Sequence, residues 1–274
     1  MNMKLEISKG NAGRRRILLN GRRLFSFVWK FDFSFFRNRW LNRELKKILG
    51  TKVIHVIGDS HTHFFSGNEY IAPVPLVNDI QTCHAKLSSF SVFHLGPSLA
   101  YNTMKEQTTT RTREKINFLF FENYIPAGAF LLCVFGEIDL RVHVFRQVQR
   151  QSTSYRDVVN TILEQYCKFL VDLQENGFHV IVWGPIPTGD MRCSKREFSG
   201  TEVERNQATA YFNERLEKFC QAYRIGFISL YADLLSREYC TNFSYLSDGC
   251  HLSQKVWTYV LPKMRTLMAK NSIT

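Results

Sequence analysis

An apolar run that ends abruptly in glycine and two polar residues is the feature that most constrains the fold of this chain. The run covers residues 53–57, and Gly58, Asp59 and Ser60 follow it directly. This pattern predicts a buried strand that delivers a serine into a tight turn. A hydroxyl at the carboxyl end of such a strand lies at the edge of an α/β sheet, where ligands bind.

A second polar motif lies near the other end of the chain. A serine is a poor nucleophile unless a base reaches its hydroxyl. The segment Asp248-Gly249-Cys250-His251 supplies a candidate base, and it stands just before a helix predicted over about residues 254–270. Taken together, the two ends of the chain suggest a hydrolase or an acyltransferase.

These two motifs resemble those of the SGNH (GDSL-type) hydrolases, and the resemblance covers roughly residues 52–268 through four short blocks. It implies Ser60 as the nucleophile, His251 as the general base and Asp248 as the group that orients the imidazole. The α/β-hydrolases share the order Ser, Asp, His, but their serine lies in Gly-x-Ser-x-Gly. Thr62 stands where that motif requires glycine, so the α/β-hydrolases are the weaker match.

The same resemblance implies an oxyanion hole that departs from the family pattern. Gly96 follows a predicted strand and matches the family's second-block glycine, whose backbone N–H holds the oxyanion together with the N–H of Ser60. The third block is expected as Gly-x-Asn-Asp, but here it is Gly136-Glu137-Ile138-Asp139. Ile138 therefore replaces an oxyanion donor, and losing one such donor typically costs on the order of 10²–10³ in rate.

Three interpretations of this replacement remain open. Arg141 supplies a charged donor instead, two backbone donors suffice, or the chain has lost catalysis. Polar and apolar residues alternate from Glu137 to His143, which is typical of a strand with one polar face. A solvated strand end with an Arg–carboxylate pair is the alternative explanation of this alternation. The residues that we expect to line the pocket are Asp59, His61, Glu137 and Asp139.

The order of elements predicts the fold class. Strands alternate with helices, so we expect an α/β protein with a three-layer, doubly wound parallel sheet of the SGNH/flavodoxin-like type and right-handed crossovers. The hydrophobic periodicity predicts strands at 53–57, 90–95, 129–136, 178–183 and 225–230, and helices at 155–176 and 201–223.

Residues 1–50 form a basic, aromatic N-terminal extension, which we separate from a hydrolase domain at 51–274. The extension holds 13 Lys and Arg against three acids, which accounts for +10 of the net charge of +12. Six phenylalanines and a tryptophan fall between residues 24 and 36. Three interpretations apply: packing against the core or a partner chain, an interfacial anchor on an anionic membrane, and nucleic-acid binding. Nucleic acid is the least favoured, because no recognised nucleic-acid fold accompanies the charge.

The cysteines and histidines indicate which disulfides and metal sites to expect. Seven cysteines contain no CxxC pair, which favours buried free thiols in a reducing compartment. The chain shows no apolar leader and no apolar run long enough to span a bilayer, so we expect a cytoplasmic protein that is peripheral at a membrane if the anchor interpretation holds. The histidines match no zinc-binding spacing such as HExxH, so no metal and no cofactor is predicted.

The sequence therefore predicts a serine esterase or acyltransferase acting on an ester, such as an O-acetyl group, of a glycan or small molecule. The expectation that the substrate is a glycan rests on family analogy alone. The alternative is a catalytically silent SGNH-like binding module with a membrane- or partner-binding extension. Ile138 favours this alternative, whereas the intact Ser60, Asp248 and His251 argue against it.

Overall fold

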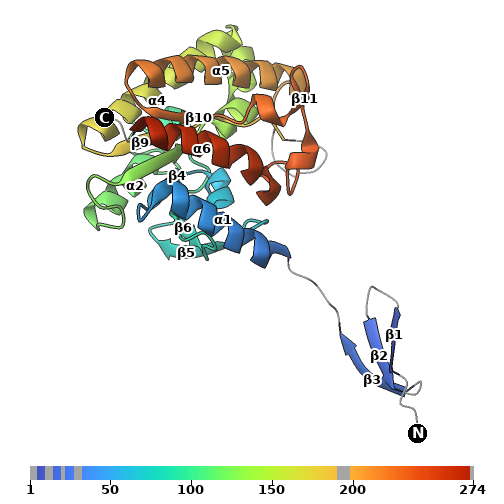
Figure 1. The fold of residues 1–274 in the computed structure, drawn as a ribbon. Coiled ribbons are helices and arrows are strands. Elements are labelled where there is room, and N and C mark those ends of the chain that lie inside the picture. The colour runs from blue at the N-terminus through green and yellow to red at the C-terminus, as the bar shows by residue number, and fades with distance from the viewer. Residues whose placement is uncertain (1–4, 10–14, 20–21, 28–32, 190–197, 272–274) are drawn as a thin grey trace. The chain divides into compact units, whose positions relative to one another are not determined.

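A computed structural model describes residues 5–9, 15–19, 22–27, 33–189 and 198–271 (Figure 1). The chain divides into two compact units, residues 1–40 and 41–274. The first unit contains an antiparallel sheet in the order β1-β2-β3 and the beginning of helix α1. The bounds of these elements are β1 (Leu5–Lys9), β2 (Arg15–Leu19), β3 (Arg22–Phe27) and α1 (Phe33–Leu49).

The second unit begins within α1, whereas the sequence analysis places the boundary at residue 50. Leu41, Leu45 and Leu49 recur at the spacing of one helix face and are buried in the core of this unit. The second half of α1 is therefore part of the body that carries the predicted site. The aromatic residues at 28–32 lie outside the described residues.

A seven-stranded sheet forms the middle of the second unit. Its strands, in sheet order, are β10 (Gly226–Ile228), β9 (His179–Trp183), β8 (Phe130–Val134), β4 (Ile54–Gly58), β7 (Phe90–His94), β6 (Ile80–Cys83) and β5 (Pro73–Val77). The first five are parallel and correspond to the five predicted strands. The sequence analysis did not predict β5 and β6, an antiparallel hairpin at the edge of the sheet. Its turn, Asn78-Asp79, adopts positive φ angles, as two-residue hairpin turns require.

Helices cover both faces of the sheet, which confirms the predicted three-layer α/β fold (Figure 1). Side chains of β8 alternate between two core clusters: Leu131 and Cys133 face one, and Leu132 and Val134 face the other. The first cluster contains α2 (Thr112–Phe121), α4 (Tyr155–Glu175) and α5 (Glu202–Ala222). The second contains the buried face of α1 and α6 (Trp257–Asn271).

The two long helices begin where their sequences place capping residues. Ser154 accepts the Asp157 N–H at the start of α4, and the Asp157 carboxylate accepts the Ser154 N–H in return. Thr201 and Glu204 form the same capping box at α5. Each box satisfies backbone donors that the first turn leaves unpaired, so it fixes the start of its helix. In the described part of the chain, no helix is both long and apolar enough to cross a bilayer.

One local prediction is wrong: residues 137–143 are helical and do not form a strand. The strand β8 ends at Val134, and a π-helical turn over Asp139–His143 leads into α3 (Val144–Gln151). The chain turns at Gly136, where φ is +105° and an added Cβ would lie 2.9 Å from the Pro185 ring. Side chains four residues apart therefore share a face, and the alternation along the sequence does not define one.

Short elements complete the unit. They are η2 (Ser60–Ser66), η3 (Ala100–Asn102), η6 (Ala232–Leu234), β11 (Leu235–Arg237), β12 (Cys240–Thr241), η7 (Phe243–Tyr245) and η8 (Gln254–Val256). The first two matter most for the site, because they follow the ends of β4 and β7.

Candidate active site

The turn after β4 holds Ser60 in a fixed place. Gly58 has φ +152°, and a Cβ at this position would overlap the carbonyl group of Val134 on the neighbouring strand, so only glycine fits. The Asp59 carboxylate then accepts the His61 N–H at 2.8 Å and caps η2. Burial raises the pKa of Asp59 to about 6. The strand end, the glycine and the cap together set Ser60 at the carboxyl edge of the sheet.

The structure brings Ser60, His251 and Asp248 together in one hydrogen-bonded chain. Ser60 Oγ lies 2.8 Å from His251 Nε2, and His251 Nδ1 lies 2.8 Å from Asp248 Oδ2. The other oxygen, Asp248 Oδ1, accepts the backbone N–H groups of His251 and Cys250. Burial opposes ionisation of Asp248, but the hydrogen bonds with His251 outweigh it and hold the pKa of this carboxyl well below its usual value. An ionised Asp248 accepts a hydrogen bond from Nδ1–H, which leaves the unprotonated Nε2 as an acceptor toward Ser60.

The predicted oxyanion glycine lies in the loop after β7, the strand that pairs with β4. Gly96 has φ +88° in the loop after β7, and the preceding Leu95 donates its N–H to the Gly58 carbonyl at 2.9 Å. A buried lysine accompanies it: Lys115 on α2 donates to the Leu95 carbonyl at 2.8 Å, and its Nζ lies 3.6 Å from where a Cβ of Gly96 would be. Burial lowers the pKa of Lys115. No sequence signal marks Lys115, which follows Arg113 and Glu114 in the polar first turn of α2.

A second buried group joins His61, Glu137 and Arg141. His61 Nε2 lies 3.4 Å from Glu137 Oε2, and Arg141 Nε donates to Glu137 Oε1 at 2.6 Å. Burial disfavours the charged form of Glu137, but its contacts with His61 and Arg141 hold its pKa well below the usual value. Burial also opposes the charge on His61, yet contacts with Cys250 and Glu137 raise its pKa well above the usual value. The Glu137 carboxylate therefore lies between the Arg141 guanidinium and the His61 ring in the interior.

This group touches the hydrogen-bonded chain through His61. The centroids of the His61 and His251 rings are 4.8 Å apart. Arg141 is 7% exposed and lies over the Phe198 ring, so the pair with Glu137 is not the solvated strand end of the alternative interpretation. Glu137 and Arg141 meet because they are one helical turn apart.

Asp139 has a different environment from the other expected pocket residues. Its carboxylate accepts the N–H groups of Ala100 at 2.8 Å and Tyr101 at 3.2 Å, at the start of η3. Burial raises the pKa of Asp139 to about 7. The carboxyl therefore ties the start of the π-helical turn to the loop that carries Gly96.

Comparisons with known proteins bear on the fold. No protein-family model and no curated protein matches the sequence. Among solved structures, the chain is similar to a GDSL-like lipase from Bacteroides thetaiotaomicron, with 15% identity, a TM-score of 0.50, and coverage of 87% of this chain and 99% of that one. It is also similar to a putative acylhydrolase from Bacteroides fragilis, with 17% identity, a TM-score of 0.49, and coverage of 88% and 99%. The chain thus adopts the α/β fold of the GDSL-type (SGNH) hydrolases.

Proposed function

We propose that this chain is a serine ester hydrolase of the SGNH type. One observation carries the proposal: Ser60, His251 and Asp248 form a chain of two 2.8 Å hydrogen bonds at the carboxyl edge of the sheet. A serine at the edge of a sheet needs no such contact for folding. A nucleophile does need it, because a base must remove its proton during attack.

The geometry supports a two-step mechanism. Ser60 Oγ attacks the ester carbonyl carbon while His251 Nε2 takes its proton, and Asp248 stabilises the resulting imidazolium. His251 then gives the proton to the leaving alcohol, and an acyl-Ser60 ester remains. In the second step water attacks this ester, His251 again accepts the proton, and Ser60 is released. If an alcohol of a sugar replaces the water, the product is a transferred acyl group.

Stabilisation of the oxyanion is assigned to the backbone N–H groups of Ser60 and Gly96. Ile138 offers no donor where the family pattern has asparagine. Arg141 bonds to Glu137, so we assign it an effect through Glu137 and His61, whose positive charge lies beside His251. A fixed cation near the reacting atoms favours negative charge that develops in the transition state.

The substrate class is an ester, and an O-acetyl group on a glycan or small molecule is our specific proposal. The experiment incubates the full chain with a fluorophosphonate probe and a short-chain aryl ester. We expect Ser60→Ala to lose both labelling and hydrolysis while its thermal melt stays unchanged. Ser236→Ala, at an exposed serine, should behave like the wild type. Adding sugar alcohols to the assay then separates hydrolysis from transfer, because transfer yields an acylated acceptor.

The second candidate function is a catalytically silent binding module of the same fold, which Ile138 favours. A wild-type chain that is folded but neither labelled nor hydrolytic would establish it. Labelling that survives in Ser60→Ala would instead place the nucleophile elsewhere.

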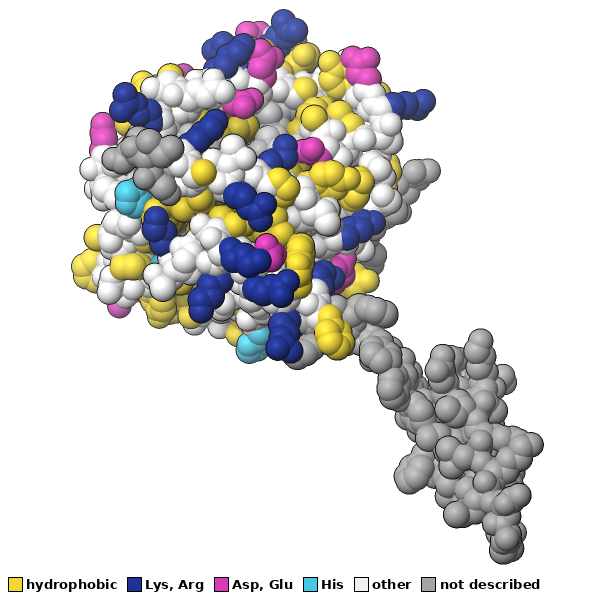
Figure 2. All heavy atoms as spheres, viewed as in Figure 1, with side chains coloured by type: hydrophobic (Ala, Val, Ile, Leu, Met, Phe, Trp, Pro, Cys, Tyr) yellow, Lys and Arg dark blue, Asp and Glu magenta, His cyan; other side chains and the backbone are white. Residues whose placement is uncertain are grey.

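We also propose that the basic N-terminal region binds an anionic membrane surface. Phe36 and Trp40 on α1 are 58% and 42% exposed. Figure 2 shows Lys and Arg side chains gathered over one face of the second unit. Exposed basic residues on its two neighbouring helices are Arg43, Lys46 and Lys47 of α1 and Arg265 and Lys270 of α6. Each such charge contributes roughly 1 kcal/mol near an anionic bilayer.

A further inference from the structure

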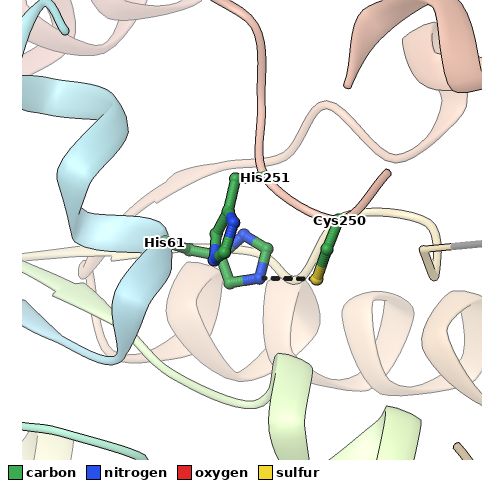
Figure 3. A group of neighbouring side chains, drawn as sticks. All are labelled: His61, Cys250 and His251. Atoms are coloured by element: carbon green, nitrogen blue, oxygen red, sulfur yellow. Dashed lines mark hydrogen bonds between the residues drawn. The ribbon is translucent and has the colours of Figure 1, made fainter. Parts of the chain in front are cut away.

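Three metal-binding side chains converge beside Ser60. The ligand atoms of His61, Cys250 and His251 all lie within 4.8 Å of one another, and all three residues are buried (Figure 3). Cys250 Sγ is 3.9 Å from His61 Nε2. In the proposed ester hydrolysis only His251 of this group transfers a proton, and the Cys250 thiol and the His61 ring form or break no bond. No sequence spacing predicts the group, because 189 residues separate His61 from Cys250.

The chemistry and spacing of these atoms suit zinc. A thiolate with two imidazoles is a donor set that binds Zn²⁺ in preference to hard cations such as Mg²⁺. Bonds of about 2.0–2.3 Å in a tetrahedral arrangement place ligand atoms roughly 3.3–3.8 Å apart. The observed separations, up to 4.8 Å, therefore need to close by at most about 1.5 Å, which side-chain rotation can supply.

The surroundings add negative charge to this group. Glu137 Oε1 lies 3.9 Å from Cys250 Sγ, and Glu137 Oε2 lies 3.4 Å from His61 Nε2. Arg141 offsets part of this charge through its bond to Glu137. A dication held by His61 and Cys250 would lie beside the carboxylate of Glu137.

We propose that His61, Cys250 and His251 form an inhibitory Zn²⁺ site. Zinc would bind His61 Nε2, Cys250 Sγ and His251 Nε2, with water in the fourth position. The Cys250 thiol and the His61 ring each release a proton to solvent. His251 Nε2 exchanges its hydrogen bond to Ser60 for the metal bond, so Ser60 loses its base. The inhibition rests on the proposed function, whereas the binding of the metal does not.

Binding is tested with cobalt, which reports its own ligands. Metal-free full-length protein is titrated with Co²⁺, and we expect one equivalent to produce the near-ultraviolet thiolate-to-cobalt charge-transfer band, which Zn²⁺ then abolishes. Losing an outer-shell partner typically costs 10–100-fold in affinity, so losing the thiolate in Cys250→Ala should cost at least about 100-fold and remove the band. Cys240→Ala, at a free cysteine outside this group, should keep the band. The absence of the band in the wild type, or its persistence in Cys250→Ala, would overturn the proposal.

Inhibition is tested with the fluorophosphonate probe, and each variant is compared with its own labelling in the absence of metal. Zn²⁺ should suppress labelling of the wild type, a chelator should restore it, and Cys250→Ala should need at least about 100-fold more Zn²⁺. If one equivalent of Zn²⁺ leaves labelling of the wild type unchanged, inhibition is refuted and the proposed function stands. A charge-transfer band in a protein that the probe never labels would refute the proposed function while the metal site stands.

Discussion

His251 Nε2 lies 2.8 Å from Ser60 Oγ, although 191 residues separate the two in the chain. The contact is possible because Ser60 follows the central strand β4, whereas the loop before α6 returns to the same edge of the sheet. Asp248 completes the contact from the preceding turn, three residues before His251.

We expect Asp248→Asn to lower kcat by roughly 10⁴-fold, because a neutral amide no longer fixes the Nδ1–H tautomer of His251. Its thermal melt should change little by comparison. Asp233→Asn is the matched control, since Asp233 pairs with Lys263 away from this chain of hydrogen bonds. Equal activities of the two variants on an aryl ester would show that Asp248 has no catalytic part.

We expect the contributions of Arg141 and Glu137 to the free energy of unfolding to be coupled. Removing one partner of a buried ion pair leaves an uncompensated charge and typically costs about 3–5 kcal/mol. Arg141→Ala should therefore lower the free energy of unfolding by that amount, and it should lower kcat because Glu137, the partner of His61, loses the bond that fixes it. In the double variant with Glu137→Gln, much of the lost stability should return. Additive losses in denaturant unfolding would contradict the coupling.

Ile138→Asn tests the incomplete oxyanion pattern. An asparagine donor is worth on the order of 10²–10³ in rate where it is fully aligned, so we expect kcat to rise by about tenfold or more. Ile138→Val, which adds no donor, is the control. An unchanged kcat in the asparagine variant would mean that other groups already stabilise the oxyanion.

Asp139 should make stability fall as pH rises from about 4 to 7, whereas His63 and His94, whose pKa values burial lowers to about 4, act in the opposite direction. The pKa of Asp139 is raised by burial from 3.8 to about 7, so folding takes up a proton throughout this window. The stabilisation is complete below the unfolded value and is lost as pH rises through the folded value. Asp59, with a pKa raised to about 6, acts in the same direction. Thermal melts across this range should show a more positive dependence of stability on pH for Asp139→Asn than for the wild type, and parallel curves would contradict the assignment.

Two truncations separate the N-terminal region from the folded body. Removing residues 1–40 should weaken salt-sensitive binding to anionic vesicles, because it deletes ten of the 13 Lys and Arg of the N-terminal extension, and should leave a folded protein that the fluorophosphonate probe still labels. Removing residues 1–50 also deletes Leu41, Leu45 and Leu49, each of which contributes about 1.5–3 kcal/mol by burial. The longer truncation should therefore unfold at a much lower temperature. Sedimentation with anionic and neutral vesicles checks the first result, and binding that is as tight after removal of residues 1–40 as before would refute the anchor.

The sequence by itself determined the parallel strands, the long helices and the three residues of the hydrogen-bonded chain. These features depend on local patterns: apolar runs bounded by glycine, helical periodicity with capping residues, and two short motifs. Ser60 and His251 could be paired in advance only because both motifs resemble those of one hydrolase family.

Only the tertiary structure determined which contacts the polar residues after β8 make. Their alternation fits a strand, but the turn at Gly136 starts a helix, so Glu137 and Arg141 share a face and Asp139 points to the backbone of η3. Only folding sets Cys250 against His61 and brings Lys115 beside Gly96. The physical reason is that the partners of a buried charge or thiol are fixed by packing between distant segments, which no local spacing encodes.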